Sequence, residues 1–287
     1  MEDRIVLITG ATGGIGKAAA TNLAKKGFTV VIHGRDAAKT KAVAQEIKNA
    51  TGNQRIDMLV ADLFSLQEVK EMAERFKHKY HKLDILINNA GGVMGKERRV
   101  TKDGLEQTIA VNLLAPFLLT ELLLPWLKKS DDARIINVAS NAHQLNAKPD
   151  FTDLTLEQGY NPLRAYGNSK LFLIWNTQRL AWMLEQQGIS HIKVNSVHPG
   201  SVATNFAVDS DLGPVLNLLA RMLRPFFITP EKGADTILYL ATAAAVQQVS
   251  GKYFVKRKEA KVSGKYYSAK HEKLVWDWCK DATCAFV

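Results

Sequence analysis

The chain has 287 residues, of which 46% are hydrophobic and 23% charged, and it carries a formal net charge of +10 at pH 7. These values are ordinary for a soluble globular protein with a sizeable core, and no fixed repeat period indicates a solenoid. The two cysteines, Cys279 and Cys284, are too few for a disulfide framework, which argues against an oxidising compartment.

We expect neither a signal peptide nor a membrane span. The N-terminus reads MEDRIVLITG and enters a strand pattern almost at once, which leaves no room for a charged region, an apolar run and a cleavage site. The longest apolar stretch, residues 113–127, contains Pro116, Glu121 and Pro125 and predicts a buried helix. We therefore expect a cytoplasmic protein, with peripheral membrane contact and homodimer formation left open.

The C-terminal segment 252–287 begins with a strongly basic stretch. Residues 252–273 contain eight Lys or Arg against two Glu, which fits either a patch for an anionic partner or a solvated tail. Tyr266 and Tyr267 interleave with these charges, but no nucleic-acid-binding module surrounds them. We therefore favour the solvated tail and expect no nucleic-acid partner.

Short apolar strand patterns alternate with helical patterns along the chain. We expect strands at residues 4–9, 28–33, 56–61, 83–88, 133–138 and 191–197, and helices at 14–26, 36–50, 65–79 and 163–187. Strands such as Val30-Val31-Ile32 are apolar at successive positions, as in a parallel sheet covered on both faces. The pattern predicts a single-domain α/β Rossmann fold: a doubly wound, mostly parallel sheet of about seven strands with helices on both faces.

A glycine-rich loop follows the first strand and reads Thr9-Gly10-Ala11-Thr12-Gly13-Gly14-Ile15-Gly16. Between a strand and a helix, such a loop lets the backbone approach a pyrophosphate at the helix N-terminus. The glycines fit two spacings, G-x-x-x-G-x-G and G-x-x-G-x-x-G, which differ in whether Gly14 or Gly13 is the middle glycine. The loop residues expected to bind a dinucleotide are Gly10, Thr12, Gly13, Gly14, Ile15 and Gly16.

The end of the second strand indicates which dinucleotide is bound. An NAD enzyme would place Asp or Glu there to bind the ribose hydroxyls. This chain reads His33-Gly34-Arg35 instead. A guanidinium attracts the 2′-phosphate of NADP(H), which a carboxylate would repel. Arg35 therefore predicts NADP(H), and Asp36 is expected to cap the following helix.

Four polar residues follow in a specific order. Asn112 lies in a helical pattern, and Ser140 follows the fifth strand. Tyr166 and Lys170 form Tyr-x-x-x-Lys at the start of the long helix. Together with the glycine loop, Asn88-Asn89-Ala90-Gly91 and the strand-end motifs, this order resembles the short-chain dehydrogenase/reductase family over about residues 4–205. The Asn-Asn-Ala-Gly motif argues against the relatives that modify nucleotide sugars, for which the second glycine spacing is typical.

The pair Tyr166 and Lys170 suits proton transfer. Residues four apart share one face of a helix, and an ammonium favours a phenolate, whose pKa is ordinarily ~10. A lowering by ~2–3 units needs about 3–4 kcal/mol, which Lys170 and an oxidised nicotinamide could supply together. Ser140 would hydrogen-bond the substrate oxygen. The resemblance implies that Lys170 also holds the nicotinamide ribose and that Asn112 holds a water in a proton relay.

The resemblance also assigns contacts outside the glycine loop. Further cofactor-binding residues are Asp62, Leu63, Asn89, Ala90, Gly91, Tyr166, Lys170, Pro199, Gly200, Val202 and Thr204. The expected substrate-binding residues are Ser140, Tyr160, Tyr166 and Phe206, with a substrate lid at about 201–229. The insert 141–165, which offers the apolar residues Phe151 and Leu154, is expected to border the cleft.

Other candidate sites are weaker. A second Tyr-x-x-x-Lys, Tyr266 and Lys270, lies in the basic segment with no strand-end serine at the matching upstream distance, which favours a surface pair. His198 precedes Pro199-Gly200 and is expected to be structural. No histidine spacing matches His-Glu-x-x-His, and no metal is expected.

Several stretches resemble the retinol dehydrogenases and the related WW-domain-containing oxidoreductase: residues 134–143, 165–170 and 196–200, and the tail from Ser250 to Phe254 with Trp276 and Trp278 after it. The resemblance implies an NADP(H)-dependent oxidoreductase, a carbonyl reductase or alcohol dehydrogenase, that interconverts an alcohol and an aldehyde or ketone. The small-molecule substrate is expected to be lipophilic. The alternative is a non-catalytic NADPH-binding interaction protein on the same fold.

Overall fold

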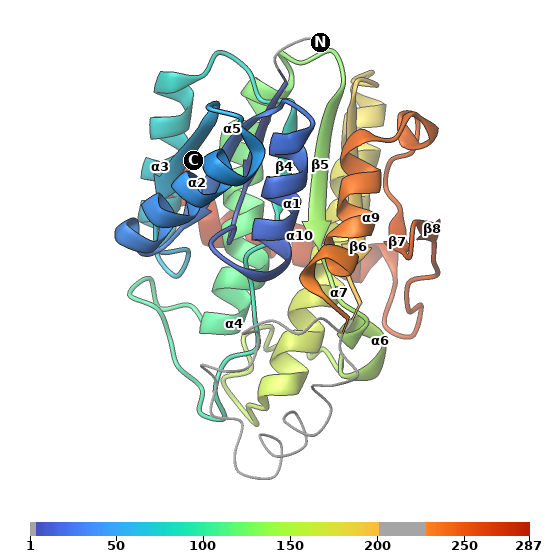
Figure 1. Cartoon of the computed structure of the whole chain (residues 1–287). Coiled ribbons are helices and arrows are strands. Elements are labelled where there is room, and N and C mark those ends of the chain that lie inside the picture. Colours follow the sequence, from blue (N-terminus) through green and yellow to red (C-terminus); the bar gives the residue numbers. More distant parts are fainter. Residues whose placement is uncertain (1–3, 201–227) are drawn as a thin grey trace.

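The computed structural model describes residues 4–200 and 228–287, which form one α/β unit (Figure 1). Its strands make a single sheet in the order β3-β2-β1-β4-β5-β6-β7-β8. Strands β1 to β7 run parallel, and β8 pairs antiparallel with β7. The doubly wound parallel sheet was predicted, and the short antiparallel edge strand β8 adds to the expected set.

The strands are β1 (Ile5–Ile8), β2 (Thr29–Gly34), β3 (Ile56–Val60), β4 (Ile85–Asn88), β5 (Ala133–Val138), β6 (Ile192–His198), β7 (Tyr253–Val255) and β8 (Lys258–Glu259). The helices are α1 (Gly14–Lys25), α2 (Ala37–Thr51), α3 (Leu66–Lys79), α4 (Gln107–Ile109), α5 (Ala115–Leu127), α6 (Ala142–Leu145), α7 (Pro162–Gln186), α9 (Pro230–Thr242) and α10 (Ala269–Thr283). A π-helical turn, η1 (Ala110–Leu114), joins α4 to α5, and 3₁₀ turns lie at η4 (Ala244–Val246) and η5 (Cys284–Phe286).

Two apolar cores lie on opposite faces of the sheet. Alternate side chains of a strand point to opposite faces, so Val6 and Ile8 pack with α1, α2 and α9, whereas Leu7 packs with α3, α5 and α7. Because both faces are covered, β1 is apolar at every position and β2 contains the apolar run Val30-Val31-Ile32, as the sequence pattern predicted.

The helix starts follow the expected capping chemistry. The side chain of Asp36 accepts a hydrogen bond from Lys39 N at 2.7 Å, and that of Ser65 accepts from Glu68 N at 3.3 Å. Asn161 caps the long helix α7 in the same way, with Pro162 at its first position. These caps place the N-termini of the helices at the edge of the sheet where the strands end.

The apolar stretch 113–127 is a core helix, as predicted. The helix Gln107–Leu127 has the length and composition of a membrane span, with a mean hydropathy of 1.7, but its most apolar part is 83% buried inside the protein. Its side chains contribute to the core beside α3 and α7.

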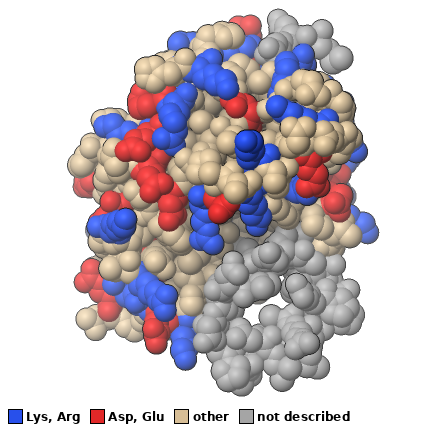
Figure 2. Space-filling model, turned by 60° about the vertical axis from the view of Figure 1, so that its left-hand side comes forward, with Lys and Arg blue, Asp and Glu red and all other residues tan. Residues whose placement is uncertain are grey.

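The basic C-terminal segment is not the solvated tail that was favoured. It forms β7, β8 and α10, because apolar residues alternate with its charges: Tyr253 joins the sheet and Trp276 packs into the core. Several of its basic side chains are exposed and paired, as in Lys252–Glu259 and Lys273–Asp277. On the face shown in Figure 2, Lys and Arg lie among Asp and Glu, so positive charge is not gathered into one patch there.

Candidate active site

The predicted motifs meet at the carboxyl edge of the sheet. The residues after β1, β4, β5 and β6 are neighbours there, because these strands are adjacent and parallel. The glycine loop, the Asn89–Gly91 turn, Ser140 and Pro199-Gly200 follow these four strands in turn. Ligands bind at this edge of doubly wound sheets.

Close packing in the glycine loop distinguishes between the two spacings. Gly10 and Gly14 have φ of +64° and +52°, a conformation that favours glycine. A Cβ at Gly16 would lie 2.5 Å from the side-chain nitrogen of Asn89, whereas a Cβ at Gly13 would meet nothing within 4 Å. The structural glycines are therefore Gly10, Gly14 and Gly16, the G-x-x-x-G-x-G spacing.

The loop fits a dinucleotide pyrophosphate. Gly13 precedes α1 in extended conformation, and no side chain caps the first amide groups of this helix. Free amides at a helix N-terminus are an anion site. Gly34 at the end of β2 also lies against the loop, since a Cβ there would come within 2.3 Å of Thr12 Cγ2. Arg35 follows Gly34 and is exposed at this edge.

Hydrogen bonds of Thr9 and Asn89 hold the glycine loop against the turn after β4. Thr9 was not identified as a functional residue from the sequence. Asn89 Nδ2 donates to Thr9 O at 2.8 Å and to Gly10 O at 3.1 Å. Thr9 Oγ1 accepts from the backbone nitrogens of Asn89 and Ala90, both at 3.0 Å. A buried threonine after a strand is too common to predict this role.

His33 is a second residue that sequence reasoning missed. Its side chain is 3% exposed and lies between the glycine loop and the end of β3. Gly10 N donates to His33 Nδ1 at 3.2 Å, and Nε2 lies 3.0 Å from Ala61 O. Since a carbonyl only accepts, Nε2 carries the proton and the ring is neutral. Burial lowers the pKa of His33, while the Ala61 contact and Asp62 oppose that effect.

Asp62 and Leu63 have local structural roles in the described contacts. Asp62 Oδ1 accepts from Phe64 N at 3.0 Å, and Asp62 N donates to Glu68 at 2.7 Å. Leu63 is buried in the core. Their expected cofactor contacts stay predictions.

Tyr166 and Lys170 lie one turn apart on α7, and both are buried. Lys170 Nζ donates to Val138 O at 2.8 Å and lies 5.7 Å from the centre of the Tyr166 ring. Burial lowers the pKa of Lys170 to about 7. Burial raises the pKa of Tyr166, although a hydrogen bond with Ser140 lowers it in part. The protein's own groups thus hold the pKa of Tyr166 above its ordinary value, which keeps the phenol protonated and suited to act as an acid. The lowering expected with an oxidised nicotinamide beside it stays a prediction.

Asn112 lies in the π-helical turn η1, a feature frequent at functional sites. Its Nδ2 donates to Gly92 O at 2.8 Å and to Thr108 O at 2.9 Å, and its Oδ1 accepts from Gly92 N at 3.1 Å. A Cβ at Gly91 would lie 2.3 Å from Asn112 Oδ1 and 3.3 Å from Lys170 Nζ. The amide of Asn112 therefore fixes the turn beside Lys170, while its water relay stays a prediction.

Two histidines hold the backbone around Ser140. His143 Nδ1 donates to Ser140 O at 2.7 Å, and Asn141 N donates to His198 Nδ1 at 3.3 Å. Ser140 Oγ accepts from Ala142 N at 3.2 Å. His198 therefore has a structural contact, as expected, whereas His143 was not foreseen.

The substrate roles predicted for Tyr160 and Phe206 stay predictions. Tyr160 Oη donates to Gly95 O at 3.4 Å and lies beside Thr108 and Glu106; burial raises its pKa to about 12. Its hydroxyl is thus used to hold the segment after β4. Val202, Thr204, Phe206 and lid residues 201–227 lie outside the described residues. Gly200 and Ile228, the described residues on either side of this segment, lie close together, because a Cβ at Gly200 would lie 2.7 Å from Ile228 Cδ1.

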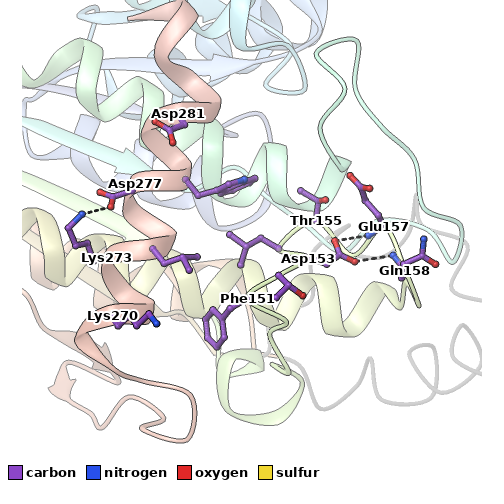
Figure 3. A pocket seen from close by; sticks show the side chains of 13 residues that line it. Phe151, Asp153, Thr155, Glu157, Gln158, Lys270, Lys273, Asp277 and Asp281 are labelled. Atoms are coloured by element: carbon purple, nitrogen blue, oxygen red, sulfur yellow. Dashed lines mark hydrogen bonds and ion pairs between the residues drawn. The ribbon is translucent and has the colours of Figure 1, made fainter.

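The middle of the insert packs against α10 instead of Ser140. Phe151 stacks on His271 with ring centres 3.6 Å apart, and Leu154 joins the core. Residues 151–158 and α10 line a separate, open cavity of about 820 Å³, seen in Figure 3. Lys270 of the second Tyr-x-x-x-Lys is exposed and lines this cavity, which contains none of the predicted catalytic residues. The described residues include no cluster of His, Cys, Asp and Glu suited to a metal.

Comparisons with known proteins agree with this geometry. The short chain dehydrogenase family model matches residues 4–213. Retinol dehydrogenase 12 of Mus musculus is 40% identical over 274 residues, covering 96% of this chain and 84% of that protein. Polyprenol dehydrogenase of Homo sapiens is 37% identical over 279 residues, covering 96% and 83%.

Solved structures give the same fold. A short chain dehydrogenase from Escherichia coli CFT073 complexed with NADPH has a TM-score of 0.68 and 27% identity, covering 88% of this chain and 96% of that one. An uncharacterized protein from Mycobacterium Paratuberculosis has a TM-score of 0.77 and 29% identity, covering 98% and 93%.

Proposed function

Since the chain belongs to the short chain dehydrogenase family and resembles the retinol dehydrogenases, we propose that it is an NADP(H)-dependent oxidoreductase. It interconverts a lipophilic alcohol and the corresponding aldehyde or ketone. The observation that carries the proposal is the constellation of buried Tyr166 and Lys170 with the half-buried Ser140 at the carboxyl edge of the sheet.

The reduction mechanism uses these side chains in defined roles. A dinucleotide held at the glycine loop would supply the hydride for the carbonyl carbon. Ser140 Oγ orients the carbonyl oxygen by a hydrogen bond, and Tyr166 donates its proton to that oxygen as negative charge develops there. Lys170, held by Val138 O, lies beside the phenol and favours the phenolate that remains. Oxidation of the alcohol uses the same groups in reverse.

The cofactor preference rests on Arg35 and on the absence of a carboxylate from the end of β2. Asp36 follows Arg35, but its carboxylate caps α2 through Lys39 N. The exposed guanidinium of Arg35 stands at the edge that carries the glycine loop, where it suits a 2′-phosphate. An NADPH complex of a solved relative supports a nicotinamide cofactor of this kind.

The lipophilic substrate class rests on the surroundings of Tyr166. Its apolar neighbours are Val93, Ala142 and Leu163, which lie beside the polar side chains of Ser140 and Lys170. An apolar environment excludes water and favours an apolar substrate. The names of two relatives, retinol dehydrogenase 12 and polyprenol dehydrogenase, fit this class.

The test measures oxidation of NADPH with linear aldehydes of increasing length. We expect kcat/KM to rise with chain length, and Phe206→Ala, in the proposed lid, to flatten this trend without changing NADPH affinity. Tyr166→Phe should lower kcat by about 10²–10⁴-fold, since it removes the general acid, and should still bind NADPH. A preference for small polar substrates would contradict the lipophilic class.

The non-catalytic alternative makes a different prediction in the same experiment. A protein of that kind would bind NADPH but would turn over neither carbonyls with NADPH nor alcohols with NADP⁺. All four predicted catalytic side chains, Asn112, Ser140, Tyr166 and Lys170, are retained, and this favours the enzyme.

A further inference from the structure

Two buried polar atoms near the end of β5 have no hydrogen-bond partner within the described part of the chain. They are Nε2 of His143 and the hydroxyl of Tyr253. Both side chains are almost wholly buried, 1% and 2% exposed respectively. Burying a polar group without a partner costs free energy. Two such groups in contact therefore need an explanation.

The two side chains contact each other. The rings of His143 and Tyr253 meet edge to face, with their centres 4.9 Å apart. His143 comes from α6, directly after Ser140, and Tyr253 comes from β7, more than 100 residues later. The fold thus brings an imidazole ring and a phenol ring, each with an unpartnered polar atom, into contact from distant parts of the sequence.

This pair belongs to the catalytic edge. His143 Nδ1 holds Ser140 O at 2.7 Å. Tyr253 packs on Ile174 of α7, and Ile174 lies one and two turns beyond Lys170 and Tyr166 on the same helix face. The charge of an ionised Tyr166 also raises the pKa of Tyr253, which places the two phenols within electrostatic reach.

The chemistry of the pair defines what it can bind. Nδ1 of His143 donates to a carbonyl, so Nε2 of the neutral ring is an acceptor. Burial lowers the pKa of His143 and keeps the ring neutral. The Tyr253 hydroxyl can donate. A bound atom that satisfies both must donate one hydrogen bond and accept another, as a hydroxyl oxygen does and a carboxylate or phosphate oxygen does not.

We propose that His143 Nε2 and the Tyr253 hydroxyl form a binding site for one hydroxyl oxygen beside Ser140 and Tyr166. That oxygen belongs either to an ordered water or to a second hydroxyl group of the substrate. If the oxygen belongs to the substrate, the proposal rests on the proposed carbonyl reductase activity and narrows its substrates to hydroxylated carbonyl compounds. If the oxygen belongs to a water, the proposal requires only the fold.

Two variants separate the proposed contacts from the folding roles of these residues. Tyr253→Phe keeps the ring that packs on His143 and removes only the hydroxyl. His143→Asn keeps a side-chain amide able to donate to Ser140 O and removes the Nε2 position. Tyr239→Phe is the matched control, because Tyr239 lies on α9 in the opposite core. The Tm of each variant confirms that it folds.

The first readout is kcat/KM for a long-chain ketone and for the same ketone with an adjacent hydroxyl group. If the substrate supplies the oxygen, Tyr253→Phe lowers kcat/KM about tenfold for the hydroxyketone and leaves the plain ketone unchanged. His143→Asn also alters the contact with Ser140 O, so it lowers kcat/KM for both ketones, and more for the hydroxyketone. If a water supplies it, both substrates lose activity to the same extent. Tyr239→Phe should match the wild type throughout.

The second readout needs no turnover. The ¹⁵N chemical shift of His143 Nε2 in the NADPH-bound protein distinguishes a free acceptor from a hydrogen-bonded one. A bonded Nε2 before substrate is added supports the water, and a change on adding the hydroxyketone supports the substrate hydroxyl. A free Nε2 under both conditions, together with unchanged kcat/KM in Tyr253→Phe, would overturn the proposal. Because this measurement does not depend on catalysis, it stands even if no carbonyl is reduced.

Discussion

The contacts of His33 lead to a quantitative prediction about stability. His33→Phe keeps a ring of similar size but removes both nitrogens, and it leaves Gly10 N and Ala61 O without their imidazole partner. An orphaned buried group costs about 1–3 kcal/mol. Ala61 O is buried, Gly10 N is only partly buried, and the apolar ring offsets part of the cost, so we expect a loss of about 2 kcal/mol at pH 8. The loop over the pyrophosphate should also bind NADPH more weakly.

The effect should depend on pH with a definite sign. Because burial lowers the pKa of His33 below its ordinary value of 6.5, the folded state resists protonation more than the unfolded state does. The stability from the neutral ring is complete above pH 6.5, and it is lost as pH falls from 6.5 toward the lowered pKa. The difference between the wild type and His33→Phe should therefore narrow from pH 8 to pH 5.

Urea unfolding at several pH values measures this difference, provided that the m-values agree. The effects of all other titrating groups cancel in the comparison. His78→Phe is the control, because His78 is exposed on α3 and its replacement should change stability by less than about 0.5 kcal/mol. A difference that stays constant or widens on acidification would refute the assignment of His33 as a neutral bridge.

Three further predictions concern the cofactor. Arg35→Ala should weaken NADPH binding at least tenfold and leave NADH binding unchanged in a fluorescence titration; equal binding of both cofactors by the wild type would show that Arg35 does not select them. Gly16→Ala should abolish NADPH binding, because its Cβ has no space, whereas Gly13→Ala, with open space around it, should bind nearly normally; similar losses in both would contradict the close packing. Charge reversal of the exposed Lys261 and Lys265 should leave NADPH affinity intact, and sedimentation with anionic vesicles tests whether this segment contacts a membrane.

Much of the fold followed from local sequence. The alternation of apolar strands and capped helices predicted the parallel sheet. A strand buried on both faces has apolar residues at successive positions, and a helix packed on the sheet has apolar residues along one face, so both patterns are visible in the sequence. The caps at Asp36 and Ser65 formed as predicted, since a cap depends on residues three positions apart. The Tyr166–Lys170 pair was predicted for the same reason, its members being one helical turn apart.

Only the tertiary structure decided which residues support that pair. His33 contacts Gly10 and Ala61 because the adjacent strands β1, β2 and β3 end side by side. Tyr253 meets His143 across more than 100 residues, because β5 and β7 lie on either side of β6. No local period encodes such contacts, so each of these residues looks ordinary in the sequence. The fold likewise showed that Gly14, not Gly13, is the middle structural glycine, and that the basic tail is part of the sheet and core. Backbone conformation and packing between distant segments exist only once the chain has folded.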